Sequence, residues 1–170
     1  MRRIVVIGNS GGGKSTLARR LSESGACPYI EIDALMWQPG WKLTPEQAYS
    51  EEHARLIAAD DWLIDGLGRR ESIPARLTRA TDIVLIDMPL WIHFWLAAER
   101  QVRWSRGKIE HPPAGLDGMP PTEAIFRTIW EVDRDWMPEI RDLVAAEGRR
   151  GKRVFRLGSV AELDRFELAP

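Results

Sequence analysis

The sequence predicts an α/β fold in which a parallel sheet is covered by helices on both faces. Short apolar runs alternate with longer segments of helical periodicity, as in chains built from strand–helix–strand units. Several of the runs are apolar at every position, which is typical of strands that are buried on both faces. With 170 residues and 44% hydrophobic content, the chain is expected to form one domain, residues 1–170, around a single core.

The first third of the chain is expected to hold two strands and two helices. The second helix has clear start signals, since Thr44 suits an N-cap, Pro45 suits the first helical position and Gln47 stands where a capping box needs it. In order, the expected elements are a strand over Arg3–Ile7, a helix over Lys14–Glu23, a strand over Tyr29–Ile32 and a helix from Thr44 to about Ala59.

Three further short runs, rich in apolar residues, predict the remaining strands of the sheet. They cover Trp62–Ile64, Ile83–Ile86 and Arg153–Leu157. Each run is short and bounded by charged or turn-forming residues, as strands in α/β folds are.

Two amphipathic helices are expected between the fourth and fifth strands. Pro138 falls within the second of them, so a kink or break is expected there. His93 is expected to be a packed histidine, and the tryptophans at helical spacing are expected to pack in the core or between helices. The apolar faces are Trp91, Trp95, Ala98 and Val102 in the first helix, and Ile125, Ile129, Val132, Trp136, Ile140 and Leu143 in the second; Trp62 and Trp130 share the packing expectation.

Residues 105–122 separate these two helices. The segment reads SRGKIEHPPAGLDGMPPT and contains four prolines and three glycines, so regular structure is not expected in it. Long loops inside compact domains are commonly functional.

Charge and cysteine content exclude several classes of protein. The formal net charge of −1 provides no overall attraction to nucleic acid or to an anionic membrane. The single cysteine, Cys27, cannot form an internal disulfide, which fits a reducing cytoplasm. No apolar stretch approaches the roughly 18 residues of a membrane span, and no signal segment is expected, so Met1 is the expected start of the mature chain.

The segment GNSGGGKS, residues 8–15, carries the most specific motif in the chain. Gly8, four further residues, Gly13, Lys14 and Ser15 match the phosphate-binding loop, and the motif lies between an expected strand and an expected helix. Glycines let successive backbone N–H groups turn toward an anion at the positive end of the helix. Lys14 would add a charge for the β- and γ-phosphates, and the Ser15 hydroxyl would ligate Mg²⁺. The expected nucleotide-binding residues are Gly8, Asn9, Ser10, Gly11, Gly12, Gly13, Lys14, Ser15 and Thr16.

A dinucleotide-binding loop of the type G-x-G-x-x-G is the rival interpretation. It would require an acidic residue about 20 positions further on, and Asp33 lies near that spacing. It would not require Lys14 and Ser15 at the end of the motif, so the phosphate-binding loop fits better.

Several quoted stretches together resemble a known family. GNSGGGKST, IEIDALMWQPGW, WLIDGLGRR and DIVLIDMP, followed by an arginine-bearing helix and loop, resemble the P-loop kinases of the adenylate kinase-like superfamily. Within that superfamily the chain looks most like the bacterial adenylate kinase-related proteins called DNA topology modulation proteins. The likeness runs from about Arg3 to Leu157.

The resemblance implies a fold, a nucleotide and a metal. It implies a three-layer P-loop NTPase fold with a five-stranded parallel sheet of order 2-3-1-4-5, and a lid formed by residues 105–122. It also implies ATP as the nucleotide and Mg²⁺ as the metal. The family name implies a role connected with DNA, although it describes a phenotype and no chemistry.

Three acidic residues at expected strand ends are candidates for the chemistry. In a sheet of the implied order, Asp65 would lie beside the phosphate-binding loop, where it could hold the Mg²⁺ water shell opposite Ser15. Asp87 is the alternative metal residue. Asp33 stands where the resembling kinases place a carboxylate that orients or deprotonates the accepting hydroxyl, whereas Glu31 is expected to face solvent or a helix.

Arginines are the candidates for stabilising charge on the transferring phosphoryl group. Arg100 and Arg103 share one helix face, and Arg106 and Lys108 follow at the start of the long loop. In the resembling kinases, arginines at this place move over the nucleotide when the lid closes.

The acceptor is expected to bind near Asp33, Trp37, Trp41 and Arg69. The two tryptophans flank a Pro-Gly pair and could wall a pocket. Arg69 stands where adenylate kinases carry an acceptor-phosphate arginine, with the alternatives being Arg70, Arg76 and Arg79. Leu67 and Gly68 stand where the adenylate kinase motif has Phe-Pro. This difference argues against a nucleoside monophosphate as the acceptor. Ser15 argues the same, since adenylate kinases commonly have glycine at that position.

Two classes of function remain open on the sequence. The first is a cytoplasmic phosphotransferase that moves the γ-phosphoryl group of ATP to a small-molecule acceptor, which is a nucleotide or a metabolite. The second is an ATP-binding regulatory protein that acts on DNA or on a protein partner. Beyond Arg100–Lys108 and Arg149–Arg153, the sequence lacks the basic stripe that DNA binding would need. The oligomeric state stays open.

Overall fold

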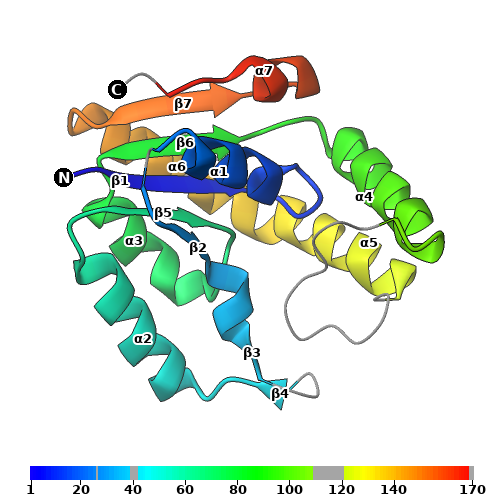
Figure 1. Cartoon of the computed structure of the whole chain (residues 1–170), viewed down its shortest axis with the longest axis horizontal. Helices are drawn as coiled ribbons and strands as arrows, with labels where there is room; N and C mark the ends of the chain where they lie inside the picture. Colours follow the sequence, from blue (N-terminus) through cyan, green and yellow to red (C-terminus); the bar gives the residue numbers. More distant parts are fainter. Residues whose placement is uncertain (26, 39–41, 109–120, 169–170) are drawn as a thin grey trace.

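A five-stranded parallel sheet forms the centre of the computed structural model, which describes residues 1–25, 27–38, 42–108 and 121–168 (Figure 1). The spatial order is β2-β5-β1-β6-β7. When only these five strands are counted along the chain, the order is 2-3-1-4-5, which confirms the predicted α/β fold and its sheet. The strands are β1 (Arg3–Gly8), β2 (Tyr29–Glu31), β5 (Trp62–Asp65), β6 (Asp82–Ile86) and β7 (Arg153–Leu157).

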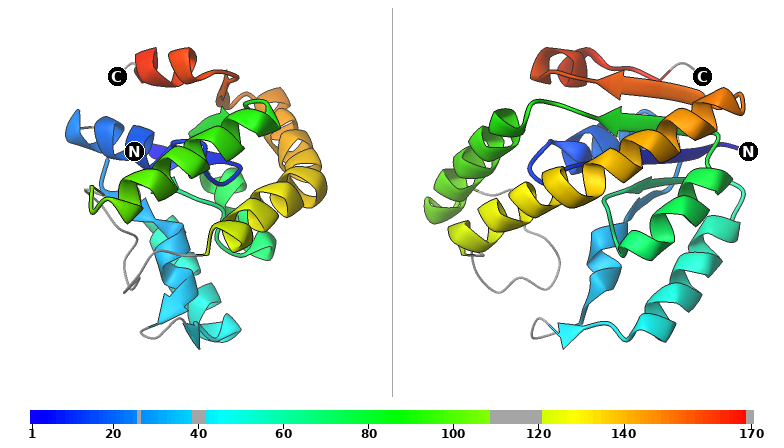
Figure 2. Two further views of the ribbon diagram at one scale, coloured as in Figure 1. Left: turned by 90° about the vertical axis from the view of Figure 1, so that its right-hand side faces the viewer. Right: turned by 180° about the vertical axis from the view of Figure 1, so that it is seen from behind.

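The two faces of the sheet bury two separate apolar clusters. Alternate residues of one strand point to opposite faces, so Val5 and Ile7 belong to one cluster and Ile4 and Val6 to the other. The first cluster packs against α2, α3 and α6, and the second against α1 and α7. The molecule therefore has three layers, with helices on both sides of the sheet (Figures 1 and 2).

The predicted helices are present with small shifts at their ends, whereas α3, α7 and the two 3-10 helices were not predicted from the sequence. A short hairpin, β3 (Trp37–Gln38) with β4 (Lys42–Leu43), lies outside the main sheet. The α-helices are α1 (Lys14–Glu23), α2 (Glu46–Ala58), α3 (Ile73–Arg79), α4 (Leu90–Ser105), α5 (Thr122–Glu131), α6 (Met137–Arg149) and α7 (Val160–Arg165); the 3-10 helices are η1 (Ile32–Met36) and η2 (Arg70–Ser72), and η3 (Val132–Trp136) is a π-helix.

The start of α2 differs from the expected capping box. Pro45 is the N-cap, and no side chain caps the helix. Gln47 donates instead to Glu51, with Nε2 and Oε1 2.9 Å apart. The Thr44 carbonyl accepts a hydrogen bond from Arg69, so this residue serves a tertiary contact, and the prediction that it caps α2 was wrong.

The expected distortion near Pro138 takes the form of the π-helix η3. This segment joins α5 to α6 without a gap. Proline lacks an N–H group and its ring clashes with the carbonyl four residues earlier, which here belongs to Arg134. A wider π turn ahead of the proline accommodates that clash, as single π turns within helices do.

Three tryptophans of α4 and α5, Trp91, Trp95 and Trp130, are exposed, contrary to the prediction that they pack in the core or between helices. The exposed fractions are 67% for Trp91, 66% for Trp95 and 53% for Trp130. The buried residues of α4 are instead His93, Ala97 and Gln101. In Figure 1, α4 extends beyond the carboxyl ends of the strands, so only one narrow stripe of the helix meets the rest of the molecule.

Trp62 is buried completely, as predicted, and we expect its truncation to have a large effect. Trp62→Ala should lower the free energy of unfolding by about 3–5 kcal/mol because it removes a large core side chain and leaves a cavity. Trp91→Ala should change it by less than about 0.5 kcal/mol, since the side chain is mostly in solvent. Urea unfolding of both variants tests this, and equal losses of stability would contradict the assigned burial.

Among the described residues, none of the helices combines the length and the apolar character needed to cross a bilayer.

Candidate phosphate-binding and catalytic site

The glycine-rich loop runs from the end of β1 to the start of α1 and follows the predicted geometry. A Cβ atom on Gly8 would lie 2.3 Å from the carbonyl oxygen of Ile86 on the neighbouring strand, so only glycine fits there. Gly13, the residue before α1, has a φ of 78° in the left-handed region that favours glycine. These constraints turn the loop sharply, so that it leads directly into the N-terminus of α1.

Lys14 is the first residue of α1, and its side chain is 8% exposed. Its Nζ atom donates a hydrogen bond of 2.8 Å to the carbonyl oxygen of Asn9, within the same loop. Burial lowers the pKa of Lys14, while the carboxylates of Asp33 and Asp65 oppose that shift. The ammonium group is therefore held inside the concave side of the loop, with two acidic side chains near enough to act on it.

Helices α4 and α5 each form a hydrogen bond with the loop. The Asn9 amide donates to the carbonyl of Ile129 on α5 over 2.9 Å. On α4, Nδ1 of His93 lies 3.0 Å from the carbonyl of Ser10, and a Cβ on Gly12 would come within 2.8 Å of the same ring. His93 is 1% exposed, which confirms that it is a packed histidine.

Ser15 and Asp65 meet beside the loop. The Ser15 hydroxyl donates to Oδ2 of Asp65 over 2.7 Å, and the Tyr29 hydroxyl donates to Oδ1 over 3.0 Å. Asp65 is 1% exposed. Burial raises the pKa of Asp65, and the hydrogen bond from Ser15 and the charge of Lys14 oppose that shift. Within the described part of the chain, neither a lysine nor an arginine forms an ion pair with Asp65.

The raised pKa of Asp65 predicts how stability depends on pH. When the pKa of a carboxyl group is higher in the folded state than in the unfolded state, the free energy of unfolding falls as the group ionises. This loss begins near the unfolded-state pKa, about 3.9, and is complete above the folded-state pKa. Asp65→Asn should therefore raise Tm at neutral pH, and the difference should disappear as pH falls below about 4. Thermal unfolding between pH 3.5 and 8 checks this, and a variant that is less stable at neutral pH would contradict it.

Asp87, the alternative metal residue, is engaged differently. Its carboxylate is 3% exposed and forms ion pairs with Arg141 at 2.9 Å and with Arg156. Burial tends to raise the pKa of Asp87, but the hydrogen bond and charge of Arg141, supported by Arg156, hold it below the ordinary value. Asp87 is thus neutralised by two arginines, in contrast to Asp65.

Asp33 lies in η1, directly after β2, and contacts the segment that follows β5. Its Oδ1 accepts a hydrogen bond of 2.7 Å from the backbone N–H of Gly68. A Cβ atom on Gly66 would lie 2.6 Å from its other carboxylate oxygen. Two glycines therefore let the end of β5 approach this carboxylate closely, and Asp33 and Asp65 come from neighbouring strand ends.

Among the candidate acceptor arginines, Arg69 directly follows Gly68, whose N–H donates to Asp33. The Nη2 atom of Arg69 donates to the carbonyl of Thr44 over 2.6 Å, and its guanidinium carbon lies 5.4 Å from the centre of the Tyr49 ring. Arg76 is completely buried and donates to the carbonyls of Gly66 and Leu67. These hydrogen bonds hold the backbone of the segment after β5 in place.

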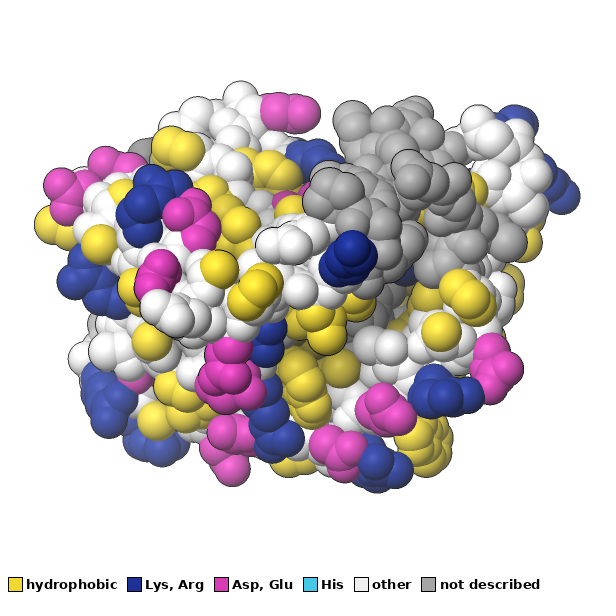
Figure 3. All heavy atoms as spheres, turned by 90° about the horizontal axis from the view of Figure 1, so that it is seen from below, with side chains coloured by type: hydrophobic (Ala, Val, Ile, Leu, Met, Phe, Trp, Pro, Cys, Tyr) yellow, Lys and Arg dark blue, Asp and Glu magenta, His cyan; other side chains and the backbone are white. Residues whose placement is uncertain are grey.

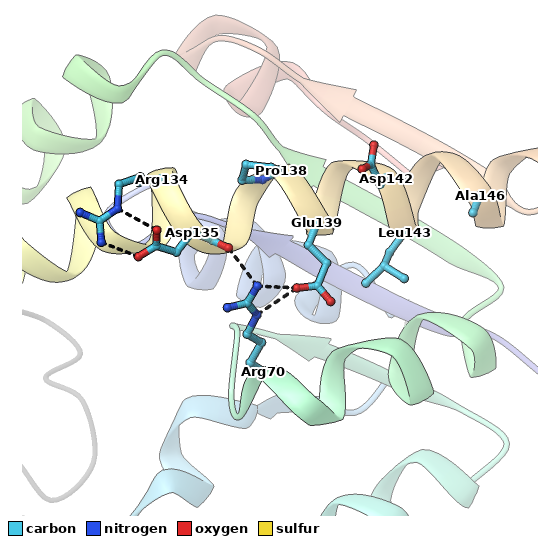
Figure 4. A pocket seen from close by; sticks show the side chains of 8 residues that line it. All are labelled: Arg70, Arg134, Asp135, Pro138, Glu139, Asp142, Leu143 and Ala146. Carbon is cyan, nitrogen blue, oxygen red and sulfur yellow. Dashed lines mark hydrogen bonds and ion pairs between the residues drawn. The ribbon is translucent and has the colours of Figure 1, made fainter.

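Arg70 points away from the loop, into a separate groove along α6 and η3 (Figure 4). It forms an ion pair of 2.6 Å with Glu139 and donates to the carbonyl of Asp135 over 3.0 Å. Arg79 donates to the carbonyl oxygens of Ile57 and Ala58 at the end of α2. Arg70 and Arg79, like Arg76, therefore have structural partners of their own.

A cavity of about 580 Å³ unites the loop with the acidic and basic candidates. Predicted residues that line it include Lys14, Ser15, Asp33, Arg100 and Arg103. The remaining lining residues are Ser10, Gly11, Gly12, Gly13, Thr16, Arg19, Glu31, Leu96, Glu99, Trp104 and Lys108.

Some predicted residues do not line this cavity. Arg106, the residue after α4, is exposed, and Lys108 reaches the cavity instead. Arg69 and the exposed Trp37 are also absent from its lining. Trp41 and most of the lid segment 105–122 lie outside the described residues. The functional roles of all these residues stay predictions.

Tyr29, Arg19 and Glu31 were not singled out by the sequence for this site. Arg19 and Glu31 form an ion pair of 3.4 Å across the cavity wall. Burial raises the pKa of Glu31, and the charge of Asp65 adds to the effect. The spacing of Glu31 and Asp33 was the available signal, because Glu31 is the last residue of β2 and Asp33 lies two positions further on, in η1.

Charged side chains are mixed over the face that Figure 3 shows, where lysines and arginines alternate with acidic side chains. Several arginines of the described surface are paired within their own helices, among them Arg55 with Glu52, Arg103 with Glu99 and Arg127 with Glu123. The described residues of this face form no continuous basic stripe.

Comparison with known proteins finds resemblance in structure only. No family model matches the chain, and no curated protein matches it. A gluconokinase from Sinorhizobium meliloti 1021 is 18% identical with a TM-score of 0.44, covering 88% of this chain and 95% of its own. A shikimate kinase from Aquifex aeolicus vf5 is 23% identical with a TM-score of 0.44, covering 83% of this chain and 99% of its own. At this level of similarity, neither neighbour assigns a residue or a substrate here.

Proposed function

We propose that this protein transfers the γ-phosphoryl group of ATP to a hydroxyl group of a small molecule. One observation carries the proposal: the phosphate-binding loop, Asp33, Arg100 and Arg103 line the same cavity. A nucleotide site alone would need only the loop. The carboxylate and arginines add what phosphoryl transfer requires, which is an oriented acceptor and cations for the charge that develops.

The loop would hold the nucleotide. Backbone N–H groups at the N-terminus of α1 point at an anion, and glycines let the backbone approach it. The Lys14 ammonium group now bonded to Asn9 would exchange that carbonyl for oxygens of the β- and γ-phosphates. The exchange costs little, because the ammonium group is already desolvated in the free protein.

Ser15 and Asp65 fit a magnesium ion by their chemistry. Both supply oxygen, which Mg²⁺ prefers, and the buried Asp65 carboxylate pairs with no lysine or arginine of the described chain. Ser15 would contact the ion directly, and Asp65 would hold part of its water shell. When bound, the ion would neutralise charge on the phosphates.

Asp33 would receive the acceptor hydroxyl. Its hydrogen bond from the Gly68 N–H occupies Oδ1 and leaves Oδ2 to accept the proton of that hydroxyl. In the transfer, the acceptor oxygen forms a bond to the γ-phosphorus, the bond from that phosphorus to the oxygen of ADP breaks, and the proton passes to Asp33. Arg100 and Arg103 would stabilise charge on the transferring group.

A panel of acceptors tests this function. ADP release from ATP is measured with sugars, sugar acids, hydroxy acids, nucleosides and nucleoside monophosphates, and products are identified by mass spectrometry. We expect one chemical class to raise ADP release far above the rate without acceptor, with a phosphorylated product. ATP turnover that stays at background with every acceptor would contradict the proposal.

A further inference from the structure

Asp65 is held from two sides by two hydroxyl groups. The Tyr29 hydroxyl, from β2, donates to Oδ1, and the Ser15 hydroxyl, from α1, donates to Oδ2. These two hydrogen bonds connect β2 and α1 to β5. Strands β2 and β5 are paired in parallel, with Glu31 opposite Asp65. Tyr29 has no role in the proposed transfer itself, so its contact with a buried carboxylate beside the loop calls for an explanation.

We infer that Tyr29 is a positioning residue that fixes Asp65 so that the Ser15 hydroxyl presents its lone pairs to the Mg²⁺ of a bound nucleotide. This inference rests on the proposed function, because it concerns the same site. It assigns Tyr29 no contact with the nucleotide or with the metal.

The direction of the Ser15 hydroxyl follows from hydrogen-bond chemistry. An ionised carboxylate can only accept, so the single proton of the Ser15 hydroxyl must point at Asp65. The lone pairs of Ser15 then face away from Asp65 and are free for a cation. Rotation of the carboxylate would release that proton to other acceptors, including the phosphates.

The Tyr29 hydroxyl prevents this rotation by holding the other carboxylate oxygen. Its ring is fixed in turn, because β2 pairs with β5 and the guanidinium carbon of Arg19 lies 5.7 Å from the ring centre. Arg19 also reaches Glu31. The ring can therefore stay in place when the hydroxyl alone is removed, which makes Tyr29→Phe a specific test.

The experiment measures nucleotide binding without any acceptor. A fluorescent ADP analogue is titrated with wild-type protein and Tyr29→Phe, first in EDTA and then at increasing Mg²⁺. We expect the Mg²⁺ concentration at half-maximal enhancement of binding to rise about tenfold in Tyr29→Phe, since outer-shell partners of metal ligands commonly have effects of 10–100-fold. Affinity in EDTA should not change, because the loop and Lys14 remain intact.

Tyr49→Phe is the matched control. It also removes one phenol hydroxyl from the interior, but that hydroxyl contacts Ser72 and the N–H of Arg69 and not Asp65. Its Mg²⁺ midpoint should equal that of the wild type. Circular dichroism and Tm confirm that both variants are folded.

A second measurement separates positioning from general damage. If Tyr29 acts through Ser15, then Ser15→Ala raises the Mg²⁺ midpoint, and adding Tyr29→Phe to it raises the midpoint by much less than tenfold. Full additivity of the two changes would overturn the inference.

Other outcomes also decide the matter. An unchanged or lower Mg²⁺ midpoint in Tyr29→Phe, or an equal loss of affinity with and without Mg²⁺, would overturn the role of Tyr29 while leaving the proposed function intact. Wild-type protein that binds no nucleotide under either condition would contradict the proposed function, and the inference would fall with it.

Discussion

Lys14→Ala is expected to weaken ATP binding at least about a hundredfold and to abolish turnover, because it removes charge-assisted hydrogen bonds to the phosphates, each contributing roughly 1.5–3 kcal/mol. Folding should be unaffected. The lysine is buried and its pKa is lowered by burial, so its loss relieves the cost of a desolvated charge. Calorimetric titration with ATP and thermal unfolding provide the two measurements.

Lys42→Ala is the control for this variant. Lys42 is exposed on β4, outside the residues that line the cavity, so ATP affinity should match that of the wild type. ATP binding by Lys14→Ala at wild-type affinity would place the nucleotide somewhere other than the glycine-rich loop.

Asp33→Asn is expected to lower kcat by about 10²–10⁴ with the acceptor identified in the panel, because an amide cannot take the proton of the attacking hydroxyl. Nucleotide affinity should be retained. The asparagine carbonyl can still accept the hydrogen bond from the Gly68 N–H, so the segment after β5 should stay in place. Steady-state kinetics and nucleotide titration of the same preparation separate the two effects.

Asp60→Asn provides the comparison at an exposed acid and should leave kcat unchanged. A kcat of Asp33→Asn within threefold of the wild type would remove Asp33 from the chemistry. A loss of ATP affinity as large as the loss in kcat would instead mean that Asp33 supports the nucleotide site.

The sheet was predictable because its signals are local. Strands covered on both faces need continuous apolar runs, and Ile4–Ile7 and Ile83–Ile86 are such runs. The loop was predictable because its motif is a short pattern of fixed spacing. The left-handed backbone of Gly13 is a local requirement, whereas the close approach of Ile86 to Gly8 appears only in the folded sheet. Four of the ten strand ends differ from the prediction, each by one residue.

The exposure of Trp91 and Trp95 was not predictable from periodicity. A periodic pattern identifies the apolar face of a helix but says nothing about whether another element covers it. Helix α4 extends past the sheet, and its contacts with the loop and α5 select the stripe of His93, Ala97 and Gln101. That choice depends on the path of the chain after β6.

The details of the site depend on strand register, which no spacing rule supplies. The sequence placed Asp33 and Asp65 at strand ends. Only the pairing of β2 with β5 brings the Tyr29 hydroxyl to Asp65. Arg76 is a similar case. It lies on α3, and only the packing of α3 against β1 and α6 brings its guanidinium group to the carbonyls of Gly66 and Leu67.

A crystal structure with a non-hydrolysable ATP analogue and Mg²⁺ tests the central claim most directly. We predict that the triphosphate lies in the loop of residues 8–15, with backbone N–H groups and the Lys14 ammonium group on its oxygens and Ser15 beside the metal. A loop that remains empty at saturating analogue, with Lys14 still bonded to the Asn9 carbonyl, would contradict it.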